Sequence, residues 1–287
     1  MCNHVFQQGG ISMKLKSLIC TALAVIVSAG MLAGCGSTQD QSKAKAADTA
    51  KKPLRVATNA TFVPFEFKDE KTGDYAGYEM DLVRAVAKTM GREVQMQDMA
   101  FNGLIPLLQS GDVDMAAAGM AITKERTEKV LFASPFYETR LVVLVKKDSG
   151  IQSKEDLANH RLAVQMGTIA ADYVQTAGLQ AKQFDHNADA LMDLQVGGSD
   201  AVIAAKPVLD YFAASNDKGN FKVIPLMDTP KQYVAFAMNK KNTELQKEVN
   251  AAIAKLKETG EFQQLYKKWF GHEPDTLPVT TEEALGK

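Results

Sequence analysis

A regular alternation of short apolar strands with helices, running from Leu54 to Phe270, most constrains the fold of this chain. Buried strands are continuous apolar and β-branched runs, whereas amphipathic helices repeat their apolar residues every three or four positions. On these criteria strands are predicted at 54–58, 113–118, 140–147, 161–165, 200–204, 221–225 and 233–238, and helices at 78–90, 104–109, 169–175, 187–196, 207–214, 244–258 and 261–270. Such alternation predicts an α/β fold with open, parallel-type sheets covered by helices.

Capping residues mark several helix boundaries in this pattern. Thr123 is a good N-cap for a helix that carries Arg126, because its hydroxyl can accept a hydrogen bond from a first-turn N–H. Ser153 stands three residues before Asp156, which is the spacing of a capping box. Gly260 separates the last two predicted helices, as expected of a residue that ends a helix. These signals place Arg126 on the first turn of its helix.

Two successive strand–helix sets followed by one late strand predict two lobes joined by two crossovers. The first lobe is expected to contain residues 53–137 and 232–287, and the second lobe residues 138–231. With 287 residues and 46% hydrophobic content, the chain is long enough to bury two cores.

Residues 1–34 have the pattern of a secretory signal peptide that starts at Met13. The segment Met13–Lys16 supplies positive charge, and an apolar stretch from Leu18 to Ala33 follows it. That stretch is shorter than the ~20 apolar residues that a membrane-spanning helix needs. A cleaved signal therefore fits the pattern better than a permanent membrane span.

A cysteine stands where cleavage is expected. Leu32-Ala33-Gly34-Cys35 resembles a bacterial lipobox, which implies that Cys35 becomes the lipid-bearing N-terminus; the alternative is an ordinary signal with a chance cysteine. Residues 35–52 would then be the lipidated cysteine and a flexible tether, because they contain almost no large apolar residue. Cys2 and Cys20 precede the cleavage point, so the mature domain is expected to have no disulfide and no thiolate metal site.

Charge and motif content argue against nucleic-acid binding and against several enzyme classes. The net charge is −1, and basic residues are interspersed with acidic ones. The histidines do not stand at metal-ligand spacing, and the chain has no nucleophile elbow, phosphate loop or dinucleotide fingerprint. Asp185-His186 could be an acid–base pair or a solvated turn. The sequence therefore predicts no metal, no cofactor and no catalytic residue.

Arg126 is the strongest polar candidate for a binding site. A guanidinium can hold a carboxylate through two parallel charge-assisted hydrogen bonds, and free N–H groups at the start of a helix add to that attraction. The alternative is an exposed helix arginine that pairs with Glu125 or Glu128. Both readings stay open at this point.

Aromatic and glycine positions supply the other candidates. Phe62 and Phe101 could sandwich the apolar or planar part of a ligand, or each could be an ordinary core residue. Gly167-Thr168 opens a helix after a strand, so the pair could bring backbone and a hydroxyl close to a ligand, or could be a plain turn and N-cap.

Ordered sequence blocks from about Leu54 to Pro274 give the chain a family resemblance. The blocks are Ala57-Thr58-Asn59, Phe62-Val63-Pro64-Phe65-Glu66-Phe67, Gly77-Tyr78-Glu79-Met80-Asp81-Leu82, Phe101-Asn102-Gly103-Leu104-Ile105-Pro106, Thr123-Lys124-Glu125-Arg126, Asp200-Ala201-Val202-Ile203 and Tyr266-Lys267-Lys268-Trp269-Phe270-Gly271. In these blocks the chain resembles the extracellular solute-binding proteins, family 3, of polar amino acid ABC transporters, and most closely those that bind glutamine.

The resemblance implies a fold and a set of partners. The fold would be the two-lobe clamshell of type II periplasmic binding proteins, each lobe a β-sheet flanked by helices, with a double hinge near 136–140 and 229–233. A small carboxylate-bearing ligand, expected to be an amino acid, would lie between the lobes. A monomer, lipid-anchored outside the cell membrane, would deliver that ligand to the permease and ATPase of the importer.

The resemblance also implies roles for individual residues. Arg126 would clamp the ligand α-carboxylate with help from Gly119 and Thr168, and Gly167 would also belong to the ligand-binding site. Phe62 and Phe101 would pack against the ligand. Asn59 would face the ligand side chain, where glutamine binders carry aspartate, and Gln165 stands where the closest pattern has lysine.

Two positions depart from the family pattern. Ala121 stands where a hydroxyl residue usually contacts the carboxylate, and Ala205 stands where an aspartate usually binds the α-ammonium. An ammonium buried without a counter-charge costs several kcal/mol. Three readings stay open: another acid reaches the site, the ligand lacks the amine, or amino acid binding is weak.

The expected function is ligand binding without catalysis, and two other classes remain as alternatives. A few relatives of the family, the cyclohexadienyl dehydratases, catalyse dehydration on a similar scaffold, but Asn59 and Ala205 cannot act as general acids. A surface sensor or adhesin that keeps the fold and uses other surfaces is the third reading.

Overall fold

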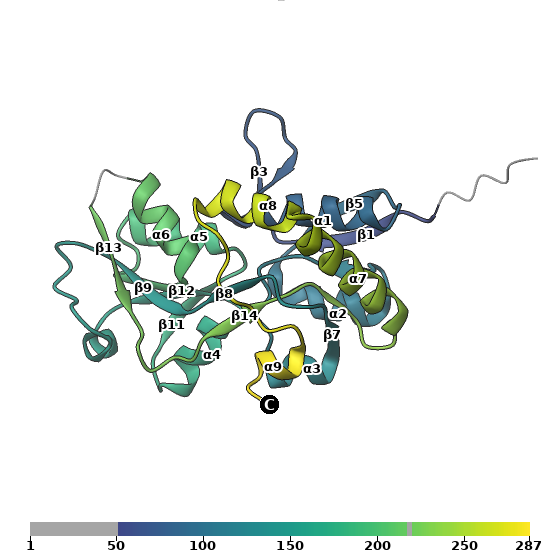
Figure 1. Ribbon diagram of the computed structural model, residues 1–287. Helices are drawn as coiled ribbons and strands as arrows, with labels where there is room; N and C mark the ends of the chain where they lie inside the picture. Colours follow the sequence, from purple (N-terminus) through teal and green to yellow (C-terminus); the bar gives the residue numbers. More distant parts are fainter. Residues whose placement is uncertain (1–50, 217–219) are drawn as a thin grey trace, which may run out of the picture. The chain divides into compact units, whose positions relative to one another are not determined.

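The computed structural model describes residues 51–216 and 220–287, which belong to one compact unit, Asp48–Lys287 (Figure 1). The predicted signal peptide, Cys35 and most of the tether lie outside the described residues. In the part of the chain that is described, no helix has both the length and the apolar character needed to cross a membrane.

The first lobe is built around a five-stranded sheet of order β5-β1-β6-β15-β7. The strands are β1 (Leu54–Thr58), β5 (Val94–Asp98), β6 (Met115–Ala116), β7 (Val130–Phe132) and β15 (Ala237–Asn239). Strand β1 is parallel to β5 and β6, whereas β15 is antiparallel to β6 and β7. The parallel core of this sheet was predicted, and β15 makes it mixed, because this late strand enters between β6 and β7 from the opposite direction.

Helices cover both faces of this sheet. The helices are α1 (Tyr78–Thr89), α2 (Leu104–Ser110), α3 (Lys124–Lys129), α7 (Thr243–Thr259), α8 (Glu261–Phe270) and α9 (Thr281–Ala284), with a short 3-10 turn, η1 (Phe101–Gly103), before α2. Val56 packs into the core beneath α1, α7 and α8, whereas the adjacent Ala57 packs with α2 on the other face. Successive strand residues point to opposite faces, so one apolar strand serves two cores.

The second lobe is built around a five-stranded sheet of order β11-β10-β12-β9-β13. The strands are β9 (Leu141–Lys146), β10 (Leu162–Gln165), β11 (Ala181–Phe184), β12 (Ala201–Ala205) and β13 (Phe221–Pro225). Strand β10 is parallel to β11 and β12, and β9 is antiparallel to β12 and β13. Helix α4 (Ile169–Thr176) packs on one face with the 3-10 segment η2 (Lys154–Asn159), and α5 (Asn187–Gln195) and α6 (Lys206–Ser215) pack on the other (Figure 1).

Two paired segments carry the chain between the two sheets. Strand β8 (Tyr137–Thr139) precedes β9, strand β14 (Gln232–Val234) follows β13, and the two pair antiparallel. The predicted single strand 233–238 is therefore wrong: it divides into β14 and β15, because its partner changes from β8 to the first sheet. The predicted hinge regions coincide with these crossovers, while the exact lobe boundaries stay a prediction.

A small three-stranded sheet, β2 (Thr61–Phe62), β3 (Glu66–Lys68) and β4 (Tyr75–Ala76), was not predicted. Phe62 lies directly opposite Glu66 in the antiparallel register, so the two side chains share one face. Gly77 closes the sheet with φ 122°, and a Cβ there would lie 2.1 Å from the Phe65 carbonyl oxygen. This sheet brings Phe62 and Glu66 to the same place.

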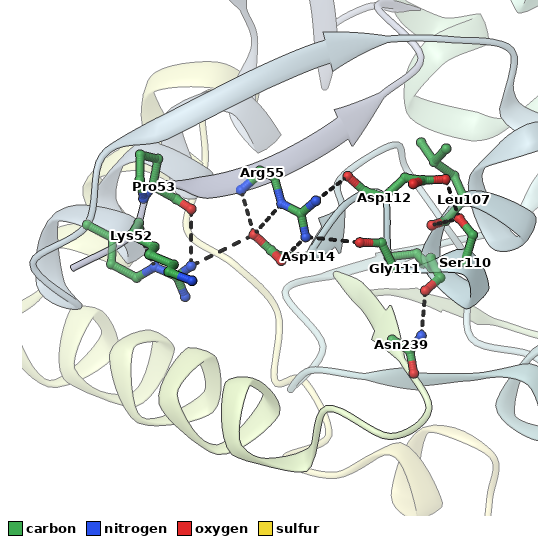
Figure 2. A network of polar contacts seen from close by, with 11 residues as sticks. Lys52, Pro53, Arg55, Leu107, Ser110, Gly111, Asp112, Asp114 and Asn239 are labelled. Atoms are coloured by element: carbon green, nitrogen blue, oxygen red, sulfur yellow. Dashed lines mark hydrogen bonds and ion pairs between the residues drawn. The ribbon is translucent and has the colours of Figure 1, made fainter.

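The two lobes share one structural device at the base of their sheets. Arg55, at the start of β1, donates from its backbone N–H and its guanidinium to the carboxylate of Asp114, with Nη2 2.7 Å from Oδ1 (Figure 2). Arg161 beside β10 makes the same contacts with Asp200, with Nη2 2.6 Å from Oδ1. Arg55 also donates to backbone carbonyls at the end of α2. Each pair ties two neighbouring parallel strands together.

Candidate functional site

A cavity with about 540 Å3 of non-atom space, mouth included, lies between the two sheets. The predicted residues that line it are Asn59, Phe62, Phe101, Gly119, Ala121, Arg126, Gln165, Thr168 and Ala205. Residues that line it without having been proposed are Glu66, Ala118, Thr139, Leu141, Ile169, Ala170, Asn187, Ile203 and Ala204. The structure therefore brings almost all of the predicted residues to one place.

Arg126 bridges the two lobes at the cavity wall. Thr123 caps α3 and accepts a hydrogen bond from the Arg126 N–H, as predicted. The guanidinium donates through Nη1 to the Ala121 carbonyl at 2.8 Å and through Nη2 to the Gly167 carbonyl at 3.0 Å, and Gly167 belongs to the second lobe. The face of Phe101 lies 5.3 Å from its central carbon.

The charge of Arg126 has no direct partner in the described part of the chain. The side chain is 7% exposed, and burial lowers its pKa to about 10, partly opposed by the charge of Asp172. Glu125 forms its ion pair with Lys129 instead. The reading of Arg126 as an exposed surface arginine is therefore wrong, and a buried cation is left facing the cavity.

The aromatic wall comes from β2 and η1. Phe62 packs over Gly119, where a Cβ would lie 2.6 Å from the Phe62 ring and where φ is 59°. Gly119 must therefore be glycine both for its conformation and for this contact. Phe101 is 8% exposed and belongs to the core around α2 as well as to the cavity wall. The core reading of Phe101 is therefore confirmed, and its contact with a ligand stays a prediction.

The end of the cavity at Asn59 is closed by amide groups from both lobes. Gln165 Nε2 donates to Asn59 Oδ1 at 2.8 Å and to the Asp185 carbonyl at 3.0 Å. Asn59 Nδ2 donates to the Met99 carbonyl at 2.7 Å and lies 2.8 Å from His186 Nδ1. His186 therefore contacts the opposite lobe, a role that its position in a turn did not reveal.

The remaining predicted residues bring no charged side chain to the cavity; they are Gly167, Thr168, Ala121 and Ala205. Thr168 caps α4, as the plain reading expected, and its hydroxyl donates to the Gln165 carbonyl at 2.7 Å. Gly167 is absent from the cavity lining but supplies the carbonyl that Arg126 contacts. Ala121 and Ala205 line the cavity, so neither position offers a charge or a hydroxyl there.

Sequence reasoning missed two buried carboxyl groups, of which Glu66 lines the cavity and Glu79 does not. Glu66 on β3 lines the cavity, is 0% exposed, and neither of its carboxylate oxygens accepts a hydrogen bond from any described donor. Glu79 on α1 is also 0% exposed and accepts a 2.7 Å bond from the Gly119 N–H. The signal was present: Glu66 alternates with Phe65 and Phe67 in a short strand, and Glu79 lies on the apolar face of a helix.

Burial governs the protonation of this pair. It raises the pKa of Glu79 to about 7, against the hydrogen bond from the Gly119 N–H. It also raises the pKa of Glu66 well above its ordinary value, and the negative charge of Glu79 adds to that shift. Two adjacent carboxyl groups without a cation share a proton.

The described residues contain no group of three metal-ligating side chains, so they offer no metal site of that kind.

A family model identifies the chain. Bacterial extracellular solute-binding proteins, family 3, match it over residues 54–272. The chain belongs to this family. Among its curated relatives are the arginine-binding extracellular protein ArtP of Bacillus subtilis, 34% identical over 83% of this chain and 92% of that protein, and a probable histidine-binding protein of Neisseria gonorrhoeae, 30% identical over 91% and 98%. The glutamine-binding protein GlnH of Bacillus subtilis is 28% identical over 91% and 99%.

Solved structures agree with the family and with its fold. An ancestral arginine-binding protein bound to glutamine is 37% identical, with a TM-score of 0.72 over 77% of this chain and 98% of that chain. The ancestral amino acid-binding protein AncCDT-1, a precursor of cyclohexadienyl dehydratase, is 36% identical, with a TM-score of 0.70 over 76% and 95%. This family-3 protein therefore has the expected type II fold with a sheet in each lobe, and these relatives are named for several different amino acids.

Proposed function

We propose that this family-3 protein is the lipid-anchored substrate-binding component of an ABC importer for a polar amino acid of the glutamine type. The cavity between the lobes captures the amino acid, and the closed form presents it to the permease and ATPase. Cys35, outside the described residues, would carry the lipid that holds the protein at the outer face of a membrane. The uncompensated Arg126 guanidinium in contact with both lobes is the observation that carries the proposal.

Arg126 suits a carboxylate that has to be held during closure. A carboxylate in the cavity can replace one or both of its present carbonyl acceptors with bidentate, charge-assisted bonds. Because Arg126 comes from the first lobe and its Gly167 contact from the second, the ligand carboxylate lies where both lobes meet. A ligand that contacts both lobes binds the closed form more tightly, and this difference drives closure.

The amide groups favour an uncharged polar side chain on the ligand. Asn59 and Gln165 close one end of the cavity without any charged group. Asn187 at the start of α5 is 1% exposed, and its Nδ2 has no hydrogen-bond acceptor among the described residues. This buried free donor suits the side-chain carbonyl of glutamine. Arginine and histidine, for which relatives are named, are the competing ligands.

Calorimetric titration tests the proposal. The purified mature protein is titrated with L-glutamine, L-arginine and L-histidine and with their amine-free counterparts, and any ligand that co-purifies is identified by mass spectrometry. We expect saturable binding with L-glutamine preferred, and loss of binding in Arg126→Ala. Absence of binding across the whole panel would overturn the proposal.

A second candidate function is supported by the neutral positions Ala121 and Ala205 together with Glu66. These features suit an amine-free carboxylate, and a protonated Glu66 in the cavity could act as the general acid of a dehydratase. Similarity to AncCDT-1 keeps this candidate in view. Consumption of prephenate or arogenate by the wild-type protein, and no consumption by the Glu66→Gln variant, would support this dehydratase function.

A further inference from the structure

The Glu66 carboxyl group is buried and faces the cavity, and its hydrogen-bonding neighbour among the described residues is another acid, the Glu79 carboxyl group. It is 0% exposed and lines the cavity beside Phe62, and no N–H or hydroxyl group of the described residues donates to either of its oxygens. A Cβ placed on Gly119 would lie 3.6 Å from Glu66 Oε1, so the carboxylate adjoins the segment that leads to Ala121. Buried polar groups without partners are rare, and one that faces a ligand cavity points to a missing ligand group.

The charge around Glu66 selects the kind of group that it lacks. Glu79 is the titratable residue whose charge acts on Glu66; its Oε2 accepts the Gly119 N–H at 2.7 Å, and no N–H or hydroxyl group of the described residues donates to its Oε1. A second acceptor or an anion would add repulsion to a site that already holds two carboxyl groups. A cationic donor would give Glu66 a hydrogen bond of the right charge and relieve the repulsion between the carboxylates.

We propose that Glu66, supported by Glu79, is the counter-ion for the α-ammonium group of the ligand, and that the first lobe therefore recognises both charges of an amino acid. This inference rests on the proposed function, and it identifies the ligand as an amino acid with a free amine. It also answers the question raised by Ala205, since the acid comes from β3 instead of from the end of β12.

Arg126 and Glu66 approach the same stretch of the first lobe. Arg126 Nη1 contacts the Ala121 carbonyl, and Glu66 adjoins Gly119, two residues earlier in the chain. Both charged side chains therefore flank one short backbone segment of the first lobe. A zwitterion with its carboxylate on Arg126 and its ammonium on Glu66 leaves its side chain free to extend along the cavity.

Binding in this way releases a proton. In the empty cavity the two carboxyl groups share one proton, because both are buried and close together. When the ammonium binds, the O–H bond of the shared proton breaks, the proton passes to the buffer, and N–H···O bonds form from the ligand to Glu66. The ligand keeps all of its own protons, so charge and atoms balance. Affinity should therefore rise with pH until the pair is ionised.

Paired ligands and a charge-matched variant test the inference by calorimetry. The probes are whichever of L-glutamine, L-arginine and L-histidine binds most tightly, and its amine-free counterpart (glutaramate, 5-guanidinovalerate or imidazolepropionate). We expect Glu66→Gln to weaken binding of the amino acid by about 100-fold and to change binding of the amine-free acid by less than about threefold. Glu70→Gln, on an exposed turn, removes the same charge outside the cavity and should leave both affinities unchanged.

Proton release gives a readout that a merely structural role would not change. Titrations near neutral pH in phosphate and in Tris, which differ in ionisation enthalpy, count the protons that leave on binding. The wild-type protein is expected to release close to one proton per amino acid and Glu66→Gln close to none. Equal proton release by the two proteins would overturn the inference.

A rescue variant keeps the test valid if Glu66→Gln perturbs folding. Ala205→Asp places a carboxylate on the opposite wall, so Glu66→Gln with Ala205→Asp should regain at least tenfold in amino acid affinity, and thermal unfolding reports whether each variant is folded. If no amino acid binds the wild-type protein, both the proposed function and this inference are overturned. If an amino acid binds and Glu66→Gln changes neither its affinity nor the proton release, this inference alone is overturned.

Discussion

The two lobes are alike in scaffold and unlike at the cavity. Each has a five-stranded mixed sheet, and in each an arginine at the start of a strand clamps the aspartate that precedes the neighbouring strand. At the cavity, however, the charged lining residues Arg126 and Glu66 both belong to the first lobe. The second lobe contributes Gln165, Thr168, Asn187 and apolar residues that include Leu141, Ile169 and Ile203.

This difference separates recognition from closure. A first lobe that holds both charges can engage a zwitterion before the second lobe arrives. The second lobe then adds neutral hydrogen bonds and excludes water, which strengthens the charged contacts already made. Substitutions of cavity residues in the first lobe and in the second lobe should therefore change ligand affinity by different amounts and with different selectivity between ligands.

The largest effect on ligand affinity is expected when the Arg126 charge of the first lobe is removed. Arg126→Ala removes two charge-assisted hydrogen bonds to the ligand carboxylate, worth about 3 kcal/mol together, so affinity should fall by about 100-fold or more. Calorimetry measures the loss. Lys124→Ala on the exposed side of the same helix is the control and should bind normally. Wild-type affinity in Arg126→Ala would mean that the carboxylate lies elsewhere.

A charge added to the cavity side of the second lobe should have a smaller effect on affinity, and one that differs between ligands. Ala205→Asp gives the ligand ammonium a second counter-ion, so we expect about a tenfold gain for an amino acid and a loss for its amine-free counterpart. The two titrations are compared with the wild-type protein. Equal gains for both ligands would show that the effect does not depend on the ammonium.

The neutral contacts between the walls should matter less. Gln165→Leu removes the bonds to Asn59 and to the Asp185 carbonyl, and we expect an affinity loss of about fivefold, equivalent to about 1 kcal/mol. Small-angle scattering should show a less complete closure with ligand. Gln183→Leu on the neighbouring strand is exposed and serves as the control. An affinity loss as large as that of Arg126→Ala would contradict the division of roles between the first lobe, which supplies the charges, and the second lobe, which supplies neutral contacts.

The smallest effects should fall on stability, where the lobes are alike. Arg55→Ala loses backbone contacts as well as its ion pair, so it should cost about 1 kcal/mol, and Arg161→Ala should cost less. Chemical unfolding measures the free energy of unfolding of both variants.

The hydrogen bond from Arg161 lowers the pKa of Asp200 from 3.8 to about 2. Its contribution is therefore present above pH 3.8 and disappears as the pH falls towards about 2, a dependence that Arg161→Ala should lose.

Much of this architecture was predictable from local pattern. Strand β1, helix α8, the caps at Thr123 and Ser153 and the strand β13 follow the predicted positions, because apolar period and capping chemistry act within a few residues. The predicted strand 113–118 shrinks to Met115–Ala116, since the chain leaves the sheet to bring Gly119 and Ala121 to the cavity. The hairpin that carries Glu66 was missed, because its strands are only two or three residues long.

The amino-acid sequence by itself determined the fold class, the family and the identity of half of the residues that line the cavity. Only the tertiary structure decided that Arg126 is a buried bridge between lobes, that His186 contacts Asn59, and that Glu66 and Glu79 meet behind Gly119. The reason is physical. Helix caps and apolar periods depend on neighbours along the chain, whereas burial, unpaired oxygens and shifted pKa values depend on residues that are distant in sequence and adjacent only after folding.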